Sequence, residues 1–406
     1  MEMGVKEQVE LLMQGTDYGD PGLAQSMAGE LGQRIARARE EGRPLRVYCG
    51  FDPRTSDLHI GHTVPIRKLR QFQELGHEVS FVVGTFTSLI GDPDKDGARQ
   101  VLERERVREN ARTYAEQAFR ILDPARTRVA YNDEWLSPLS LGDFIGLASR
   151  FTVQQFLARD NFRRRWEAGD AVWLHETFYP VLQAYDAFHL KADVQVEGSD
   201  QIFNIVTASR RLMAALGAEP NVAVIVGILP GMDGSVKMSK SLGNHIPILT
   251  PPADMYGKLM SVPDAALRAY FDRLSSMGKA EIEALFRAIA DGTASPMDAK
   301  MRLAREIVSV FHSPEAAKEA EGEFIRVHRR GGAPEDMPVF RPTAGQRVTE
   351  VIVAAGLAAT RSEARRLVAQ GGVFLDGVRV EDPEAPAARG VLRVGRRRFL
   401  RVTGCP

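Results

Sequence analysis

Residues 45–75 read LRVYCGFDPRTSDLHIGHTVPIRKLRQFQEL, and this stretch decides the fold. Its first seven residues predict a short buried strand, DPRTSD predicts a turn, and Leu58 to Leu75 predicts a helix with apolar residues at helical spacing. Gly76 ends that helix, and the apolar run from Val79 to Gly84 predicts a second strand. A strand–helix–strand unit of about forty residues has the length of a parallel crossover. We therefore expect an α/β domain built on a Rossmann-like, doubly wound parallel sheet.

The predicted sheet continues after a helical insertion. Residues of about 101–190 are mostly helical in pattern, whereas DVQVEG at 193–198 and VAVIVGILP at 222–230 are typical of strands. Beyond Pro252 the pattern is helical to about residue 328, and residues 329–346 are rich in glycine and proline, as linkers are. The expected organisation is an α/β domain at 1–245, a helical domain at 246–330, a linker at 331–345 and a small α+β domain at 346–406.

The last of these domains carries clear local signals. Thr360 and Glu363 form a capping box ahead of the helix SEARRLVAQ, Gly371 can end that helix, and Asp376-Gly377 predicts a hairpin turn. Residues 345–406 hold 11 Arg against six Asp and Glu, so this segment is +5 although the whole chain has a net charge of +0. A basic domain attached to an acidic body indicates a nucleic-acid partner.

Composition narrows the class of protein. A chain of 406 residues that is 44% hydrophobic fits two or three globular domains and excludes a disordered or fibrous protein. No run of about twenty apolar residues exists, and the start MEMGVKEQVELLMQG lacks the features of a signal peptide. Cys49 and Cys405 are too few for a disulfide framework or a cysteine-based zinc site. We expect a cytoplasmic protein that binds no membrane.

The motif DLHIGH places His59, Gly61 and His62 where the first strand leads into its helix, which is where open parallel sheets bind ligands. Unpaired backbone N–H groups favour a phosphate there, Gly61 allows close approach, and two imidazoles can donate hydrogen bonds. Two histidines at the start of a helix that have no function would give the same sequence pattern. A metal site is a third reading, but no Cys or HExxH-type partner accompanies them, so we expect no metal held by these side chains.

A second motif, KMSKS, spans Lys237 to Ser241 within GMDGSVKMSKSLGN, a glycine-rich loop. Alone it would be an ordinary solvated loop. In this order on one α/β domain, however, the two motifs resemble the hallmarks of the class I aminoacyl-tRNA synthetases. That resemblance implies ATP with Mg²⁺, His59 and His62 near the phosphates, and Lys237 and Lys240 over the leaving pyrophosphate. A carboxylate attacking the α-phosphate needs alignment and positive charge rather than a protein acid or base.

Three further segments resemble the bacterial tyrosyl-tRNA synthetases of the KMSKS-containing type: YCGFDP at 48–53, YPVLQAYD at 179–186 and GSDQ at 198–201. Tyr179, Gln183 and Asp186 share one helix face, although a polar helix face turned to water would show the same spacing. The resemblance implies that Tyr48 and Asp186 bind the phenol hydroxyl of L-tyrosine. By the same resemblance, the remaining tyrosine-binding residues are Asp52, Asp92, Tyr179, Gln183 and Gln201. The ATP-binding residues so implied are Cys49, Gly50, Gly61, Gly198, Asp200, Met238 and Ser239.

The same resemblance extends over nearly the whole chain and implies tRNA(Tyr) as partner and a homodimer. Residues 297–338 look like the helical domain of these enzymes, and the terminal unit resembles a small RNA-binding module shared with a ribosomal protein. Five arginines of that module are the expected tRNA contacts: Arg365, Arg366, Arg396, Arg397 and Arg398. The run Arg163 to Arg165 could touch the acceptor stem, though such a run is more often a solvated helix face.

Three departures from the family pattern stand out, and three rival readings remain. Arg54 replaces a threonine near the pyrophosphate, Glu197 replaces the first glycine of GGSDQ, and GDPDKDGAR replaces a GDPSGK-type loop. A tryptophanyl enzyme would share the fold but not need the phenol-binding pair. An RNA-binding protein with an inactive site would not need intact HIGH and KMSKS motifs, and a plain nucleotidyltransferase would not need the basic module.

Overall fold

The computed structural model describes residues 3–93, 102–329, 337–343, 345–395 and 398–403. Its contacts divide the chain into two compact units, Met1–Pro314 and Glu315–Pro406. Arg396 and Arg397, most of the GDPDKDGAR loop and part of the expected linker lie outside the described residues. Within those described ranges, no helix has both the length and the apolar character needed to cross a membrane.

The first unit is built on a five-stranded sheet in the order β3-β2-β1-β4-β5, in which every neighbouring pair is parallel. The strands are β1 (Arg46–Phe51), β2 (Glu78–Val83), β3 (Thr127–Tyr131), β4 (Val194–Gly198) and β5 (Val222–Val226). Both faces of the sheet are covered, which explains why β5 is apolar throughout and buried at all five positions. The predicted doubly wound parallel sheet is confirmed.

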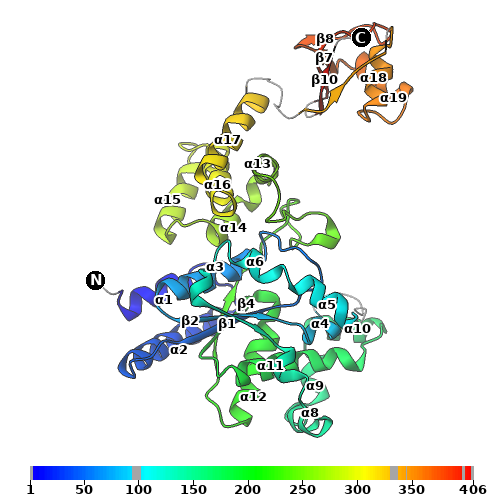
Figure 1. The fold of residues 1–406 in the computed structure, drawn as a ribbon. Helices are drawn as coiled ribbons and strands as arrows, with labels where there is room; N and C mark the ends of the chain where they lie inside the picture. Colours follow the sequence, from blue (N-terminus) through cyan, green and yellow to red (C-terminus); the bar gives the residue numbers. More distant parts are fainter. Residues whose placement is uncertain (1–2, 94–101, 330–336, 344, 396–397, 404–406) are drawn as a thin grey trace. The chain divides into compact units, whose positions relative to one another are not determined.

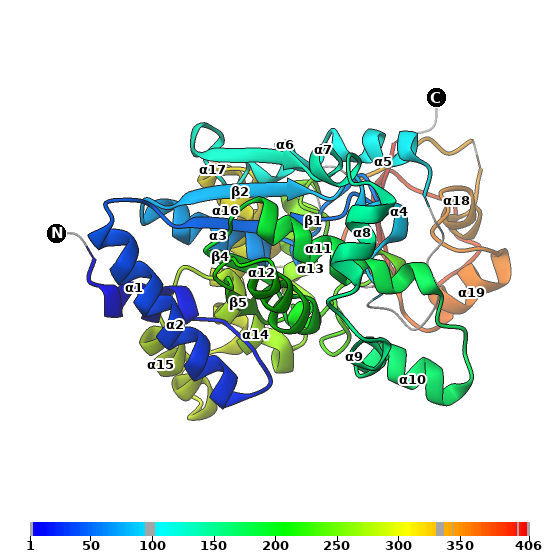
Figure 2. The same cartoon turned by 90° about the horizontal axis from the view of Figure 1, so that it is seen from below.

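Helices pack on both faces of this sheet (Figure 1). Helix α3 (Thr63–Glu74) contacts β1, β2 and β4, and α6 (Tyr114–Ala118) contacts β2 on the same side. On the opposite face, α11 (Phe178–His189) and α12 (Arg210–Ala215) bury an apolar cluster against the strands, seen from that side in Figure 2. The cluster includes Tyr48, Val82, Trp135, Leu182 and Met213.

The strand order reverses between β1 and β4. From β1 the chain winds outward through β2 to the edge strand β3, and it then returns across the sheet to β4 and continues to β5. Connections therefore leave the carboxyl ends of β1 and β4 in opposite directions, which opens a crevice between the two strands. Such a switch point is where open α/β sheets bind their ligands.

The segment expected to be a helical insertion at about 101–190 contains a strand of the main sheet. Helices α5 (Arg104–Ala111) and α6 precede β3, and the remaining helices of this segment follow it: α7 (Asp133–Leu136), α8 (Leu141–Ala148), α9 (Val153–Leu157), α10 (Asp160–Ala168) and α11. The expectation of a mostly helical insertion missed this strand at 127–131, because β3 is an edge strand with partly exposed side chains and lacks a continuous apolar run.

The helix predicted from Leu58 begins only at Thr63. Residues 58–62 instead form a turn tied to a distant segment, since the Ile60 N–H donates to the Ile246 carbonyl at 2.9 Å and His59 forms a bridge with Pro247. The HIGH motif is thus a turn that leads into α3. This pairing connects residues far apart in the sequence, which a local pattern does not reveal.

Helices complete the first unit at both of its ends. Helices α1 (Val5–Met13) and α2 (Pro21–Glu40) precede the sheet, and four helices follow it: α13 (Pro252–Met260), α14 (Asp264–Leu274), α15 (Lys279–Ala290) and α16 (Pro296–Phe311). The helical pattern predicted beyond Pro252 is therefore confirmed.

The second unit begins with α17 (Pro314–Phe324) and contains a mixed sheet in the order β6-β10-β9-β7-β8. Its strands are β6 (Val339–Phe340), β7 (Val373–Leu375), β8 (Val378–Arg379), β9 (Gly390–Val394) and β10 (Arg398–Val402). Helices α18 (Val348–Ala354) and α19 (Arg361–Ala369) bury Val351, Ile352 and Val368 in its core. The predicted small α+β module is confirmed.

Local signals of this module behave as the sequence predicts, with one difference. Thr360 Oγ1 accepts from the Glu363 N–H at 3.2 Å, but the Glu363 carboxylate accepts from the Ala359 N–H rather than from Thr360. Asp376 and Gly377 have φ of 47° and 83°, as a two-residue hairpin turn with two positive φ values requires.

Candidate active site

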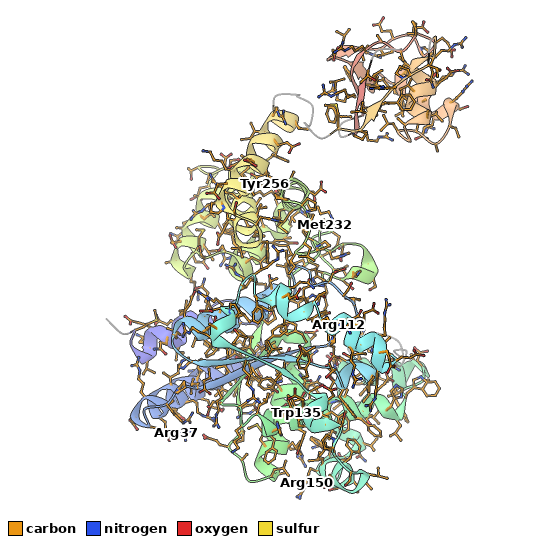
Figure 3. The ribbon with its side chains drawn as sticks, in the orientation of Figure 1. Arg37, Arg112, Trp135, Arg150, Met232 and Tyr256 are labelled. Carbon is orange, nitrogen blue, oxygen red and sulfur yellow. The ribbon has the colours of Figure 1, made fainter. Side chains whose placement is uncertain are left out.

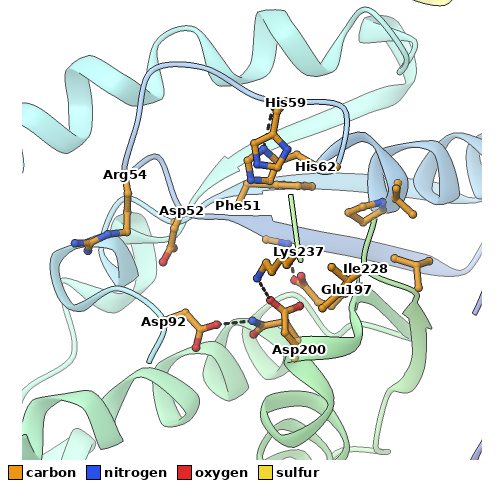
Figure 4. A pocket seen from close by; sticks show the side chains of 18 of the residues that line it. Phe51, Asp52, Arg54, His59, His62, Asp92, Glu197, Asp200, Ile228 and Lys237 are labelled. Carbon is orange, nitrogen blue, oxygen red and sulfur yellow. Dashed lines mark hydrogen bonds and ion pairs between the residues drawn. The ribbon is translucent and has the colours of Figure 1, made fainter. Parts of the chain in front are cut away.

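A cavity of about 510 Å³ lies at the switch point of the parallel sheet. Every residue assigned above to catalysis, tyrosine or ATP lines this cavity except Cys49, which is fully buried in β1. These residues come from β1, the turn before α3, the segment after α4 (Thr87–Ile90), α11, β4 and the KMSKS loop. Figure 4 shows them converging from opposite walls, with the two histidines facing Lys237 and Asp200.

Asp186 lines this cavity and is itself buried. Its Oδ1 accepts a hydrogen bond from Trp135 Nε1 at 2.7 Å, and its Oδ2 accepts from Asn132 Nδ2 at 3.2 Å. Burial raises the pKa of this carboxyl to about 8, although both donors oppose the rise. The nearby Tyr48 hydroxyl is buried and makes no hydrogen bond to any described residue. Burial, and then the charge of Asp186, raise the Tyr48 pKa. An unpaired hydroxyl beside a carboxyl suits a ligand hydroxyl group.

A chain of hydrogen bonds joins Asp186 to Asp52. Asn132 Nδ2 also donates to Thr87 Oγ1 at 3.0 Å, and Thr87 Oγ1 donates to Asp52 Oδ1 at 2.7 Å. Burial raises the pKa of Asp52 to about 6. The chain passes close to Gly84, where a Cβ would lie 2.1 Å from Asp52 Oδ1, so only glycine fits. These contacts hold both carboxyl groups in place before a ligand binds.

Asp92 anchors a second polar network. Its Oδ1 accepts from Arg159 Nη2 at 3.0 Å, and its Oδ2 accepts from Gln201 Nε2. Asn204 Nδ2 then donates to Gln201 Oε1 at 2.8 Å and to Gln183 Oε1 at 2.9 Å. Arg159 and Asp92 are both buried, so this is an enclosed ion pair. Three of the residues predicted to bind the amino acid are therefore connected to one another.

The two histidines of the turn stack, with ring centroids 3.7 Å apart. The His59 N–H donates to His62 Nδ1 at 3.2 Å, so a neutral His62 carries its proton on Nε2. Burial, and then the neighbouring charges, lower the pKa of His62 to about 4 and that of His59 to about 2. With these lowered pKa values both rings are neutral at pH 7, so each carries one ring N–H that can donate a hydrogen bond.

The KMSKS loop is held against the same cavity by its own backbone. The Met238 N–H donates to the Leu229 carbonyl at 3.0 Å, and the Ser239 N–H donates to Asn244 Oδ1 at 2.8 Å. Lys237 pairs with Asp200, and Lys240 Nζ lies 3.3 Å from Asp57 Oδ2. Both lysine side chains are nearly half exposed, so an incoming anion can compete for them.

Two of the departures from the family pattern also line the cavity. Arg54 Nη1 donates to the Ser88 carbonyl at 2.7 Å. Glu197 is buried, and its Oε1 accepts from the Gly50 N–H at 3.0 Å. Burial, opposed by this bond, raises the Glu197 pKa well above its usual range. Glu197 therefore lies in the cavity wall, bonded to the backbone of β1.

Several residues of this site were missed by the sequence analysis: Thr87, Asn132, Trp135, Arg159 and Asn204. Trp135, labelled in Figure 3, lies on the face of the sheet that α11 covers. The only local signal was polar and aromatic residues just after a strand, at Asn132 and Trp135, and that strand itself was not predicted.

The basic residues outside the cavity differ in role. Arg165 is buried and makes a two-point ion pair with Glu176 at 2.8 and 2.9 Å, so it is structural and cannot contact tRNA. In the second unit, Arg365 pairs with Glu384, Arg398 donates to the Leu357 carbonyl, and Arg366 is exposed.

No group of three or more His, Cys, Asp and Glu among the described residues could hold a metal ion.

Comparison with protein families gives two matches. A model described as tRNA synthetases class I (W and Y) matches residues 40–329, and an S4 domain model matches residues 346–390. A tyrosine–tRNA ligase of Moorella thermoacetica is 44% identical over 407 residues, which cover 99% of this chain and 97% of the relative. One of Thermotoga maritima is 44% identical over 374 residues, which cover 91% of this chain and 93% of the relative.

Comparison with solved structures supports the fold. A tyrosyl-tRNA synthetase from Archaeoglobus fulgidus, complexed with L-tyrosine, matches with a TM-score of 0.60 and 23% identity over 79% of this chain and 100% of its own. A tryptophanyl-tRNA synthetase from Plasmodium falciparum matches with a TM-score of 0.55 and 14% identity over 78% of this chain and 88% of its own.

Proposed function

Since this chain belongs to the tyrosine–tRNA ligases, within the class I tRNA synthetases, we propose that its cavity binds tyrosine and ATP side by side. The family reaction activates tyrosine with ATP to tyrosyl-adenylate and pyrophosphate, and then transfers tyrosine to tRNA. One observation carries the assignment of the site. Residues from six separate segments, selected from sequence motifs alone, line a single cavity at the switch point of the sheet.

The phenol ring of tyrosine enters the end formed by Tyr48 and Asp186. Asp186 accepts a hydrogen bond from the phenol hydroxyl, while Trp135 and Asn132 hold its carboxyl from behind. Phenylalanine would leave the buried Tyr48 hydroxyl and the Asp186 carboxyl without that partner. This is the penalty that lets a site reject an analogue lacking a hydroxyl, and tyrosine enzymes are the standard example of it.

The ammonium group of tyrosine lies against Asp92, Tyr179 and Gln183, with Gln201 beside them. The Arg159 ion pair and the Asn204 hydrogen bonds fix this group before the substrate arrives. Asp52 lies between this network and the phenol end. Fixed polar groups cost less reorganisation when the substrate binds, which favours a near-attack position for its carboxylate.

ATP occupies the opposite part of the cavity, with its phosphates between the HIGH turn and the KMSKS loop. His62 Nε2–H and His59 donate hydrogen bonds as neutral rings, and Lys237 and Lys240 exchange their carboxylate partners for phosphate oxygens. As the carboxylate oxygen attacks and the bond to pyrophosphate breaks, negative charge builds up on the oxygens of the pentacoordinate α-phosphorus and on pyrophosphate, and these donors stabilise it. No described side chain is required as a general acid or base.

Mg²⁺ bound with ATP would add positive charge at the phosphates. Asp57 and Asp200, which pair with the KMSKS lysines, are the candidate carboxylates for it. Such a pair fits the preference of Mg²⁺ for one or two carboxylates together with substrate phosphates. The protein itself positions ATP through Gly50, Gly61 and Gly198, where a side chain would obstruct the nucleotide.

The second unit supplies the tRNA contact, because an S4 domain spans residues 346–390. We propose five arginines as the tRNA contacts: Arg365, Arg366, Arg396, Arg397 and Arg398. We also propose that the α/β domain ends at residue 245, the helical domain at 330 and the linker at 345. Because the proposed charging of tRNA serves translation, we propose that the protein acts in the cytoplasm. The tyrosine-dependent exchange of labelled pyrophosphate into ATP tests the activation step directly, and absence of exchange would contradict the proposed site.

A homodimer is proposed from the apolar surface of residues 141–174. Six of the 13 large exposed apolar side chains in the described ranges lie there: Leu141, Ile145, Val153, Trp166, Trp173 and Leu174. Exposed apolar groups of this density mark association surfaces. Light scattering should give twice the 44.8 kDa chain mass, and Leu141→Glu with Leu174→Glu should reduce it. A monomeric parent protein would refute the dimer.

A further inference from the structure

The segment that follows the KMSKS loop, residues 244–248, runs beside the HIGH turn. His59 forms an antiparallel bridge with Pro247, and the Ile60 N–H donates to the Ile246 carbonyl at 2.9 Å. These backbone contacts join two segments that are almost two hundred residues apart in the sequence. The turn that carries the two histidines and the loop that carries the two lysines are therefore tied to each other by their backbones.

His245, at the start of this segment, packs its ring against His59. The two ring centroids lie 6.0 Å apart and the ring planes meet at 63°, which is an edge-to-face arrangement of aromatic rings. His59 also stacks on His62 of its own turn, with centroids 3.7 Å apart, and its side chain is buried. The His59 imidazole thus contacts one ring from the HIGH turn and one ring from the chain that continues the KMSKS loop.

The surroundings of His245 favour an aromatic contact over a polar one. Its Nδ1 is buried and makes no hydrogen bond to any described residue, which costs stability. Burial, and then the charges of Lys258 and Lys240, lower the pKa of His245, while Asp57 opposes them, so the ring is neutral at pH 7. His245 does not line the cavity and so does not face the space proposed for ATP.

We propose that His245 is a positioning residue for tyrosine activation, because its ring holds the His59 imidazole in the orientation that donates to the phosphates of ATP. The inference rests on the proposed function. A hydrogen-bond donor lowers the barrier most when it is fixed in place before charge develops, and a ring free to turn would lose part of that effect. His245 follows the KMSKS loop in the chain, so the orientation of His59 also depends on the position of that loop.

The experiment measures the single-turnover rate of tyrosyl-adenylate formation in the full-length protein and in variants of His245. His245→Leu keeps much of the side-chain volume but removes the ring, and it should slow this rate by about 10-fold with the KM for tyrosine unchanged. His245→Phe supplies an aromatic ring and should recover most of the rate. Equal rates in the parent and in His245→Leu would overturn the proposal, as would equal losses in the Leu and Phe variants.

A double-mutant cycle with His59→Ala distinguishes positioning from a general loss of stability. Removal of the His59 ring should slow the same step by about 100-fold. If His245 acts through that ring, His245→Leu should cause no further loss in the His59→Ala background. Additive losses in the double variant would overturn the proposal, because His245 would then affect the reaction without His59.

His312→Leu is the matched control. His312 is a partly buried histidine of the same compact unit, its Nε2 lies 2.9 Å from the Thr250 carbonyl, and it does not line the cavity. This substitution should lower the free energy of unfolding in urea and leave the single-turnover rate unchanged. A loss of rate as large as that of His245→Leu would trace both effects to reduced stability and would also overturn the proposal.

Failure of this proposal differs from failure of the proposed function. A parent protein without tyrosine-dependent pyrophosphate exchange would contradict the assignment of the active site as a whole. Normal exchange in the parent, with an unchanged single-turnover rate in His245→Leu, would contradict only the positioning role. Circular dichroism of each variant establishes that it is folded before the rates are compared. If His245→Leu does not fold, His245→Ala takes its place in the comparison with His245→Phe.

Discussion

Trp135 Nε1 donates a 2.7 Å hydrogen bond to Asp186 Oδ1, and both groups are buried. The indole is itself fixed by stacking on His189, with ring centroids 4.7 Å apart and planes 12° apart. Trp135 follows the edge strand β3, whereas Asp186 lies on α11. The orientation of the carboxyl that we propose binds the phenol hydroxyl thus depends on a contact between two segments about fifty residues apart.

We expect Trp135→Phe to weaken the selection of tyrosine over phenylalanine by about 10-fold, because one of the two donors to the carboxyl is lost. Asp186→Ala should weaken this selection further, because the carboxyl that accepts the phenol hydrogen bond is then absent. The ratio of kcat/KM for the two amino acids in pyrophosphate exchange measures both effects. Trp166→Phe, at an exposed position, is the control and should change nothing. Unchanged selectivity in Asp186→Ala would show that this carboxyl does not read the hydroxyl.

The raised pKa of Asp186 predicts a pH-dependent stability of the ligand-free protein. An unfolded Asp has a pKa of about 3.9, whereas burial raises the folded value to about 8. Between these two values the folded state holds the extra proton, so this group's contribution to stability is lost as the pH rises. Asp186→Asn should remove a decline on the order of 4 kcal/mol between about pH 5 and pH 8. Urea unfolding of both proteins at several pH values measures this. The free energy of unfolding should fall more steeply with pH in the parent than in Asp186→Asn, and an equal pH dependence would refute the pKa shift.

Removing the neutral imidazole of His62 should slow adenylate formation by about 100-fold, with little change in tyrosine affinity, because the donor acts on charge that appears only in the transition state. Lys240→Ala should have a similar effect. His62→Gln keeps an N–H donor and should recover part of the rate. Burial holds the His62 pKa near 4, so the single-turnover rate should show no histidine titration between about pH 6 and pH 8. Full rates in His62→Ala and Lys240→Ala would remove both from the mechanism.

The Arg159–Asp92 pair predicts a strong coupling, because removing one partner leaves a buried charge. Arg159→Met should cost about 3–5 kcal/mol of unfolding free energy, and adding Asp92→Asn should restore part of it. Arg163→Met, in the helix α10 that begins after Arg159, is exposed and paired with Asp160, so it should cost about 0–1 kcal/mol. Urea unfolding of the single and double variants measures the cycle. Additive effects would mean that the ion pair does not hold Asp92 in place.

The sequence predicted those parts of the molecule that depend on local pattern. The strands β1, β2, β4 and β5 and the helices beyond Pro252 follow from apolar runs and periodicity. The turn residues Asp376 and Gly377 follow from the positive φ that a two-residue hairpin demands. Motifs near strand ends then converge, since carboxyl ends of parallel strands meet at one edge of the sheet.

What the sequence could not predict depends on distant pairing. Strand β3 is a partly exposed edge, so its five residues lack the apolar run that identified the others. Asn132 and Trp135 acquire their roles only because β3 brings them beneath α11. Arg159 could not be told from a surface arginine until its contact with Asp92 was known. The position of Glu197 also depends on the neighbouring strand, since its partner is a backbone N–H of β1.

Ion pairs within the second unit limit which arginines are free to bind RNA. Arg365 and Arg347 both pair with Glu384, and the Arg398 guanidinium is bonded to the Leu357 carbonyl. An RNA phosphate can still replace the exposed partners, because surface pairs are weak. Arg366 is exposed on α19, so a variant of this residue tests RNA binding most directly. Arg366→Glu should raise the KM for tRNA and leave pyrophosphate exchange unchanged, whereas an equal loss in both half-reactions would point to a folding defect.

Removing the S4 domain should separate the two half-reactions. A protein ending near residue 335 keeps every residue of the cavity and should form tyrosyl-adenylate at the full rate, because the first compact unit ends at Pro314. It should charge tRNA poorly, since phosphate contacts dominate RNA affinity and residues 345–406 carry a net charge of +5. Charging by the full-length protein should fall steeply with salt, while adenylate formation in either protein should respond weakly. Equal tRNA charging by the two proteins across the salt series would show that this domain does not hold the tRNA.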